Sequence, residues 1–125
     1  MPVSEGFVEW ISPGVAKIEW TATAAGDVGN AHFVGGADRL TVQVEGLAGG
    51  GNTSNVRMEG SVIPDIPTGA GTWETLTDPT GGNLSSNANF LAEVQERPRW
   101  LRPHVSTATT ATGFNIAVIA SFPRR

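Results

Sequence analysis

Strict alternation of apolar and polar side chains is the feature of this sequence that most restricts its fold. The segment VAKIEWTATA at residues 15–24 alternates without a break, and RLTVQVEG at 39–46 and NVRMEGSVI at 55–63 do the same. A period of two places successive side chains on opposite faces of an extended chain, so one face can be buried and the other exposed. These three segments are therefore predicted to be half-buried β-strands.

The residues between these segments are rich in turn formers. The chain contains 16 Gly and 8 Pro, and the glycine-rich LAGGGNTS predicts that residues 39–63 form an antiparallel hairpin. The loop PDIPTGAGT at 64–72 is long enough to cross from one sheet to another, and DPTGGN at 78–83 is a strong turn signal after WETLT. GFNIAVIASF, at 113–122, is apolar nearly all round and is predicted to be a central strand. A single helical turn is expected at NFLAEVQ, residues 89–95.

Together these patterns predict an all-β fold, a single-domain antiparallel β-sandwich that is jelly-roll-like and has about seven to eight short strands. A chain of 125 residues is long enough for one such core. The sandwich domain is expected over residues 15–125. Residues 1–14 precede the first clear strand and carry Phe7 and Trp10, and they are expected to form an N-terminal arm that orders against a neighbouring subunit.

Charge is divided unevenly along the chain. Residues 1–96 hold all 12 acidic residues and 3 basic ones, a net charge of −9, whereas residues 97–125 hold five arginines and no acid. A nucleic-acid surface normally needs a dense basic face, often with stacking aromatics, and five scattered arginines fall short of one. No nucleic-acid partner is expected. No membrane partner is expected either, since no run of about 20 apolar residues is present, and MPVSEGFVEWIS lacks the features of an export signal.

The segment EVQERPRWLRPHVS at 93–106 concentrates three arginines, two prolines and a tryptophan. Pro98 and Pro103 cannot donate ladder hydrogen bonds, so the segment between them is predicted to be an edge strand or to be interrupted at its ends. An extended backbone would point Trp100 and Arg102 to the same side. An arginine beside a buried tryptophan can stack on its ring and pair with a carboxylate from a neighbouring strand or chain, which favours a structural clamp or an interface.

The side chains form no recognisable catalytic or metal-binding pattern. Cysteine is absent, and His32 and His104 lie 72 positions apart, which is a poor arrangement for zinc. Ser61 lacks the strand-to-helix turn that exposes a nucleophile, and nothing in the sequence brings His104 to it. Glu93 and Glu96 lie close to arginines, which favours salt bridges over a proton-donating acid. No catalytic residue, metal or cofactor is expected.

Taken in order, the segments IEW, GDVG, GGADR, TVQVEG, EGS, WETLTDPTGG and RPRWLRPHVS resemble the pattern of small virion proteins of tailed bacteriophages, over roughly residues 15 to 122. The resemblance implies a compact β-sandwich or jelly roll that binds the outside of the capsid as a cement or decoration protein. It also implies a homotrimer whose partners are the major capsid protein or neighbouring virion subunits. Such a protein would be made in the host cytoplasm and lie on the capsid surface of the virion.

This resemblance gives the arginine-rich segment the role of an interface, because desolvated arginine and tryptophan side chains are enriched at interface hot spots. The predicted interface residues are Phe7, Trp10, Arg97, Arg99, Trp100 and Arg102. A carbohydrate-binding jelly-roll module is the alternative, since WETL and RPRWLRP also resemble discoidin-like modules, and Trp73 or His32 would then contact the sugar. An enzyme is the third class, although the sequence supplies neither a positioned base nor a nucleophile.

Overall fold

The computed structural model describes residues 7–22, 27–46, 55–63, 72–86, 89–106 and 114–123. These residues form the strands β1 (Phe7–Ser12), β2 (Val15–Ala22), β3 (Asp27–Val28), β4 (His32–Phe33), β5 (Arg39–Glu45), β6 (Asn55–Ser61), β7 (Glu74–Thr75), β8 (Ser85–Ser86), β9 (Phe90–Glu93), β10 (Trp100–Ser106) and β11 (Phe114–Ser121). Seven of these strands have four residues or more, which agrees with the predicted number. The other four have two residues each and are too short to show a periodicity.

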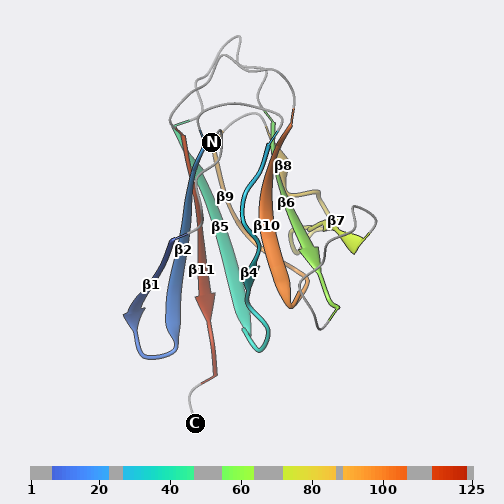
Figure 1. The fold of residues 1–125 in the computed structure, drawn as a ribbon. Coiled ribbons are helices and arrows are strands. Elements are labelled where there is room, and N and C mark those ends of the chain that lie inside the picture. The colour runs from blue at the N-terminus through green and yellow to red at the C-terminus, as the bar shows by residue number, and fades with distance from the viewer. Residues whose placement is uncertain are drawn as a thin grey trace.

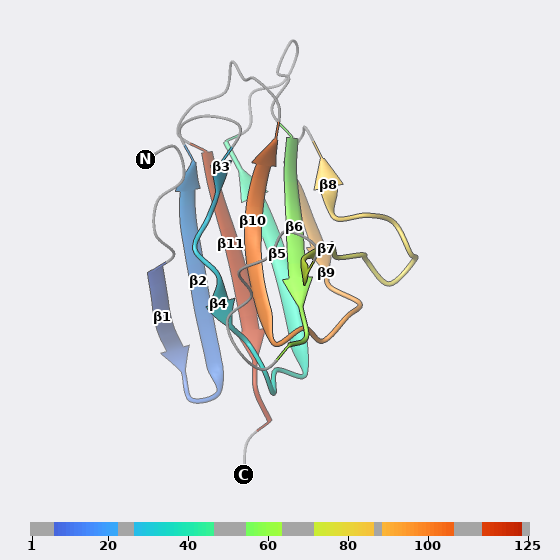
Figure 2. The same ribbon diagram turned by 45° about the vertical axis from the view of Figure 1, so that its right-hand side comes forward.

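The strands form two antiparallel sheets that lie face to face (Figures 1 and 2). Sheet A has the order β1-β2-β11-β5-β9, and sheet B has the order β3-β10-β6-β7, with β4 also paired to β10 and β8 to β6. The all-β fold and the antiparallel sandwich are thus confirmed. The jelly-roll topology stays a prediction.

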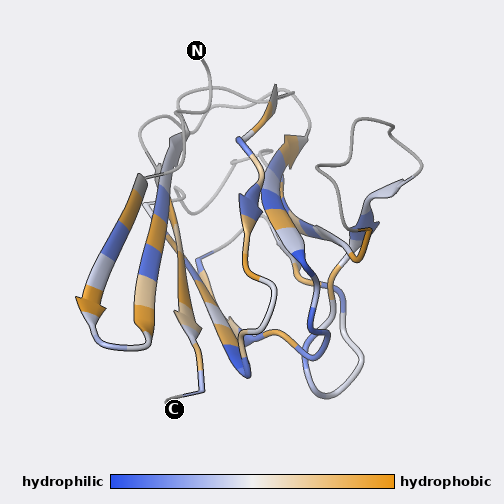
Figure 3. Cartoon of the chain, turned by 60° about the horizontal axis from the view of Figure 1, so that its bottom comes forward, coloured by the Kyte–Doolittle hydropathy of each residue, from blue (hydrophilic) through white to orange (hydrophobic). Residues whose placement is uncertain are grey.

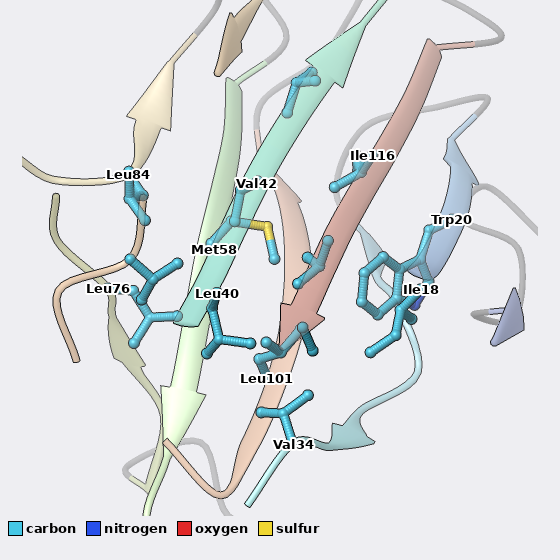
Figure 4. Close-up of a cluster of buried hydrophobic side chains, with 14 of the residues drawn as sticks. Ile18, Trp20, Val34, Leu40, Val42, Met58, Leu76, Leu84, Leu101 and Ile116 are labelled. Atoms are coloured by element: carbon cyan, nitrogen blue, oxygen red, sulfur yellow. The ribbon is translucent and has the colours of Figure 1, made fainter. Parts of the chain in front are cut away.

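Alternating side chains fill the space between the sheets, and the stripes of Figure 3 follow this alternation along the strands. β11 lies between β2 and β5, as expected of a central strand, and its Ile116 and Val118 are fully buried. Figure 4 shows Ile18 and Trp20 of β2 on the same core as Met58 of β6. The core is therefore built from both sheets.

Two local expectations for strands β5, β6 and β9 are wrong. Residues 39–63 are not a hairpin, because β5 pairs with β11 and β9 whereas β6 pairs with β10 in the other sheet. Alternation only requires that each apolar face be covered, and strands in opposite sheets cover each other across the core. The helical turn expected at 89–95 is absent, because β9 pairs with β5 there. Pairing in a sheet has overridden a weak local preference.

The predictions for the two segments before and after β7 have different outcomes. Residues 64–71 lie outside the described part of the chain, but the strands on either side, β6 and β7, are neighbours in sheet B. The loop at 64–72 therefore does not connect two different sheets. The predicted turn at 78–83 is confirmed: Oδ1 of Asp78 accepts hydrogen bonds from the backbone N of Thr80 and Gly82, and Gly81 has a φ of 90°.

The N-terminal arm and the proline-bounded segment also differ from expectation. Residues 7–12 of the expected arm form β1, the outermost strand of sheet A, paired with β2 of the same chain. β10 is not an edge strand, because β6 covers one side and β3 and β4 cover the other in two short pieces. The carbonyl of Pro103 accepts from N of Gly29 at 2.9 Å. The N and O of a strand residue point the same way, so the missing N–H of Pro103 faces the gap between β3 and β4.

Gly29 fits closely in this gap, and a larger residue there should destabilise the protein. A Cβ at position 29 would lie 2.7 Å from Cγ of Pro103 and 2.9 Å from Cδ1 of Trp20. We expect Gly29→Ala to lower the free energy of unfolding by about 1–3 kcal/mol through overpacking, measured by urea denaturation. Asn30→Ala, at the exposed next position, is the control, and equal stability of the two variants would contradict the close fit.

Candidate interaction surface

The outer face of sheet B carries a row of polar and aromatic side chains. The antiparallel register of β10 and β6 places Arg102 opposite Glu59, His104 opposite Arg57, and Trp100 opposite Ser61. Leu101 and Val105, which alternate with these residues along β10, are fully buried in the core. Since side chains alternate along a strand, this row must point away from the core. The predicted common side for Trp100 and Arg102 is confirmed.

Glu59 is the centre of this row and is 6% exposed. Its Oε1 accepts a hydrogen bond from Nε of Arg102 at 2.9 Å, and its Oε2 accepts one from Nε of Arg57 at 3.1 Å. Nδ1 of His104 lies 3.3 Å from the same Oε2. One buried carboxylate is thus surrounded by two guanidinium groups and a histidine, so the negative charge is fully compensated.

The surroundings of Glu59 set its ionisation. Burial by itself would raise the pKa of this carboxyl group, but the hydrogen bond and charge of Arg102 and the contact with His104 outweigh burial. The pKa of Glu59 therefore lies below its ordinary value. Glu59 is ionised at neutral pH and acts as an acceptor only.

Arg57 links the strands through His104 as well. Its Nη2 lies 2.7 Å from Nδ1 of His104. The same Nδ1 lies near Oε2 of Glu59, so Arg57, His104 and Glu59 form one connected group across β6 and β10.

Trp73 packs against the guanidinium group of Arg102. Cζ of Arg102 lies 4.1 Å from the centre of the Trp73 ring, which is within the range of a cation–π interaction. Trp73 is only 8% exposed. The arginine clamp that the sequence suggested is therefore made within this chain, with Glu59 of the neighbouring strand and Trp73 as its partners.

The other arginines and Trp100 have separate surroundings. Nη1 of Arg97 donates to three successive backbone carbonyls, of residues 94, 95 and 96, at 3.0 to 3.1 Å, so it closes a turn after β9. The Arg99 side chain is exposed, while its backbone bonds to Val34 and Ser61. Trp100 is half-buried and meets Phe33 of β4 edge to face, with ring centres 5.3 Å apart.

The predicted residues of β1 lie on the other sheet, at its free edge. Phe7 is the first residue of β1, and the structure describes only its backbone. Trp10 is 63% exposed, with its ring centre 5.8 Å from that of Phe122. Val8 and Ile11 are 44% and 54% exposed. The six predicted residues therefore belong to two surfaces, the β1 edge of sheet A and the region of β10 in sheet B, rather than to one.

The residues considered for catalysis and for sugar binding are not brought into suitable positions. Ser61 and His104 are separated by four residue pairs along the ladder, about 13 Å at the usual rise per residue, so they do not meet. Arg102 covers the ring of Trp73, and His32 packs edge to face on Trp20 at 5.5 Å. The described residues contain no group of three or more acidic, histidine or cysteine side chains placed to hold a metal ion. Within the same ranges, no helix is long and apolar enough to cross a membrane.

Sequence reasoning missed Glu59, Arg57 and Phe33. The signal for the first two was present, because Arg57, Glu59 and Ser61 alternate with Val56 and Met58 in NVRMEGSVI. What the pattern could not show is that β10 lies beside β6 and supplies a second arginine and a histidine.

Comparisons with protein-family models, with curated proteins and with solved structures gave no match. The function must therefore be inferred from the surfaces of this chain and from its sequence pattern.

Proposed function

We propose that this chain is a structural virion protein of a tailed bacteriophage, a capsid cement or decoration protein that binds the outer surface of the head through protein–protein contacts and assembles as a trimer. The sequence pattern across residues 15 to 122 and the antiparallel sandwich support this proposal. The carbohydrate-binding alternative is weaker, because the ring of Trp73 is covered by Arg102.

The exposed edge strand β1 carries the proposal. No described strand pairs with its outer side, and Val8, Trp10 and Ile11 all expose large apolar surface. Soluble proteins usually protect such edges with lysine, proline or a covering segment, and the strand FVEWIS contains one charged residue and no proline. An edge of this kind can pair with a neighbouring subunit and bury its tryptophan there.

Light scattering tests the assembly directly. A stable trimer would have about three times the 13.0 kDa mass of the chain. We expect Trp10→Ala to weaken association at least about tenfold, since a buried interface tryptophan commonly contributes 2 kcal/mol or more. Leu91→Ala is the matched control, because Leu91 is 68% exposed on β9, the opposite edge of the same sheet.

Binding to the head is measured by co-sedimentation with phage heads that lack the protein. The wild type and Leu91→Ala should sediment with the heads, and Trp10→Ala should remain largely in the supernatant. Urea denaturation of the variants shows whether they fold equally well. Glycan binding without head binding would instead favour the carbohydrate-binding module.

A further inference from the structure

A pocket of about 290 Å³ opens at the end of sheet B, away from β1. Its floor is apolar and buried, and it consists of Gly60, Leu76 and Pro98. Val62 and Ile63 are 70% and 37% exposed and form part of its wall. The volume is at the lower limit of small-molecule clefts, so it suits a single long side chain better than a larger ligand.

The absence of a side chain at Gly60 lets Leu76 and Pro98 pack closely against its backbone. A Cβ there would lie 2.7 Å from Cδ2 of Leu76 and 2.9 Å from Cβ of Pro98. The β6–β7 register pairs Gly60 with Glu74, so Glu74 lies on the same side of the sheet as the missing side chain. Glu74 is exposed, and it lines the pocket beside the apolar floor.

A second acidic residue, Glu96, also lines the pocket, and both of its carboxylate oxygens accept hydrogen bonds from Thr77. Burial would raise its pKa, but hydrogen bonds from the hydroxyl group and backbone N of Thr77 outweigh burial and hold the pKa below its ordinary value. No lysine, arginine or histidine is among the described residues that line the pocket. Among the described lining residues, the site thus combines an apolar floor with two acidic side chains and no basic one.

We propose that this pocket binds an arginine side chain presented by a partner protein, with the methylene stem on Leu76 and Pro98 and the guanidinium group at Glu74 and Glu96. An arginine stem packs on apolar surface while its planar head donates to carboxylates, so one side chain satisfies both parts of the pocket. This site lies on the other sheet from β1, and the inference does not depend on capsid binding.

The probe for this site is N-acetyl-arginine methylamide, added to the full chain and followed by methyl NMR. The uncharged, nearly isosteric citrulline derivative is the control ligand. We expect saturable shifts of the methyl groups of Leu76, Val62 and Ile63, with binding in the millimolar range for a single side chain. Citrulline should bind more weakly, because it lacks the charge that the carboxylates recognise.

Glu74→Gln is the variant that tests the charge. Glu74 is exposed, so the spectrum of the unliganded variant should remain that of the folded protein. We expect it to weaken arginine binding about two- to fivefold and to reduce the preference over citrulline. Glu45→Gln, an exposed glutamate on β5, should change neither. The absence of shifts at these methyl groups, equal shifts with citrulline, or an unaffected Glu74→Gln variant would each overturn the proposal.

Discussion

Replacing Glu59 by glutamine should destabilise this protein more than any other single polar substitution among the described residues. The side chain of Glu59 is 7% exposed, and its carboxylate lies between Arg57 and Arg102. Removing its charge leaves two guanidinium groups facing each other without a counter-ion. Breaking a buried ion pair in this way costs about 3–5 kcal/mol, and we expect the lower end because both arginines are partly exposed.

Urea denaturation followed by tryptophan fluorescence measures this loss. Glu45→Gln, which removes an exposed carboxylate from β5, is the matched control and should change the stability by less than about 0.5 kcal/mol. If Glu59→Gln were as stable as the control, the positive charges of Arg57 and Arg102 would be solvated by water and would not need the carboxylate of Glu59.

A comparison of the wild type with Glu59→Gln over a range of pH tests the ionisation of Glu59. Its pKa in the folded protein is lowered from the ordinary value of 4.5, so the folded state binds this proton less readily than the unfolded state. The contribution of Glu59 to stability is therefore complete above pH 4.5 and is lost as the pH falls through the folded pKa. The difference in stability between the wild type and Glu59→Gln should shrink over that acid range. A difference that grows as the pH falls would show the opposite sign of shift.

The second large effect is expected in the core. Leu101 is fully buried and belongs to the cluster between the two sheets (Figure 4), whereas Leu91 is 68% exposed on β9. Leu101→Ala should lower the free energy of unfolding by about 2–5 kcal/mol, through lost burial and the cavity that remains. Leu91→Ala should change it by less than about 0.5 kcal/mol.

This comparison also tests how β10 is oriented. Leu101 lies between Trp100 and Arg102 in the sequence, and the structure points it inward and its two neighbours outward. Losses of equal size at Leu101 and Leu91, measured by urea denaturation, would be incompatible with this orientation. In that case Arg102 and His104 would not lie beside Glu59 on the outer face of sheet B.

The candidate surfaces could be predicted only in part from the sequence. Alternation indicated that Trp100 and Arg102 share a face, and the chemistry of arginine suggested a tryptophan and a carboxylate as its partners. Neither partner could be named, because Trp73 and Glu59 come from distant segments. The sequence predicts an N-terminal arm at residues 1–14, because Phe7 and Trp10 precede the first clear strand, whereas residues 7–12 form the edge strand β1.

The sequence by itself determined the fold class and the inner faces of β2, β5 and β6, because a period of two leaves only one side of a strand apolar. It also determined the turn at Asp78, where side-chain acceptors and Gly81 act within a few residues. The tertiary structure alone decided which strands are neighbours. The apolar faces of β5 and β6 would be buried equally well whether the two strands lay in the same sheet or in opposite sheets. Only the packing of the whole chain distinguishes these two arrangements. That packing placed Arg102 beside Glu59 and left β1 at the edge.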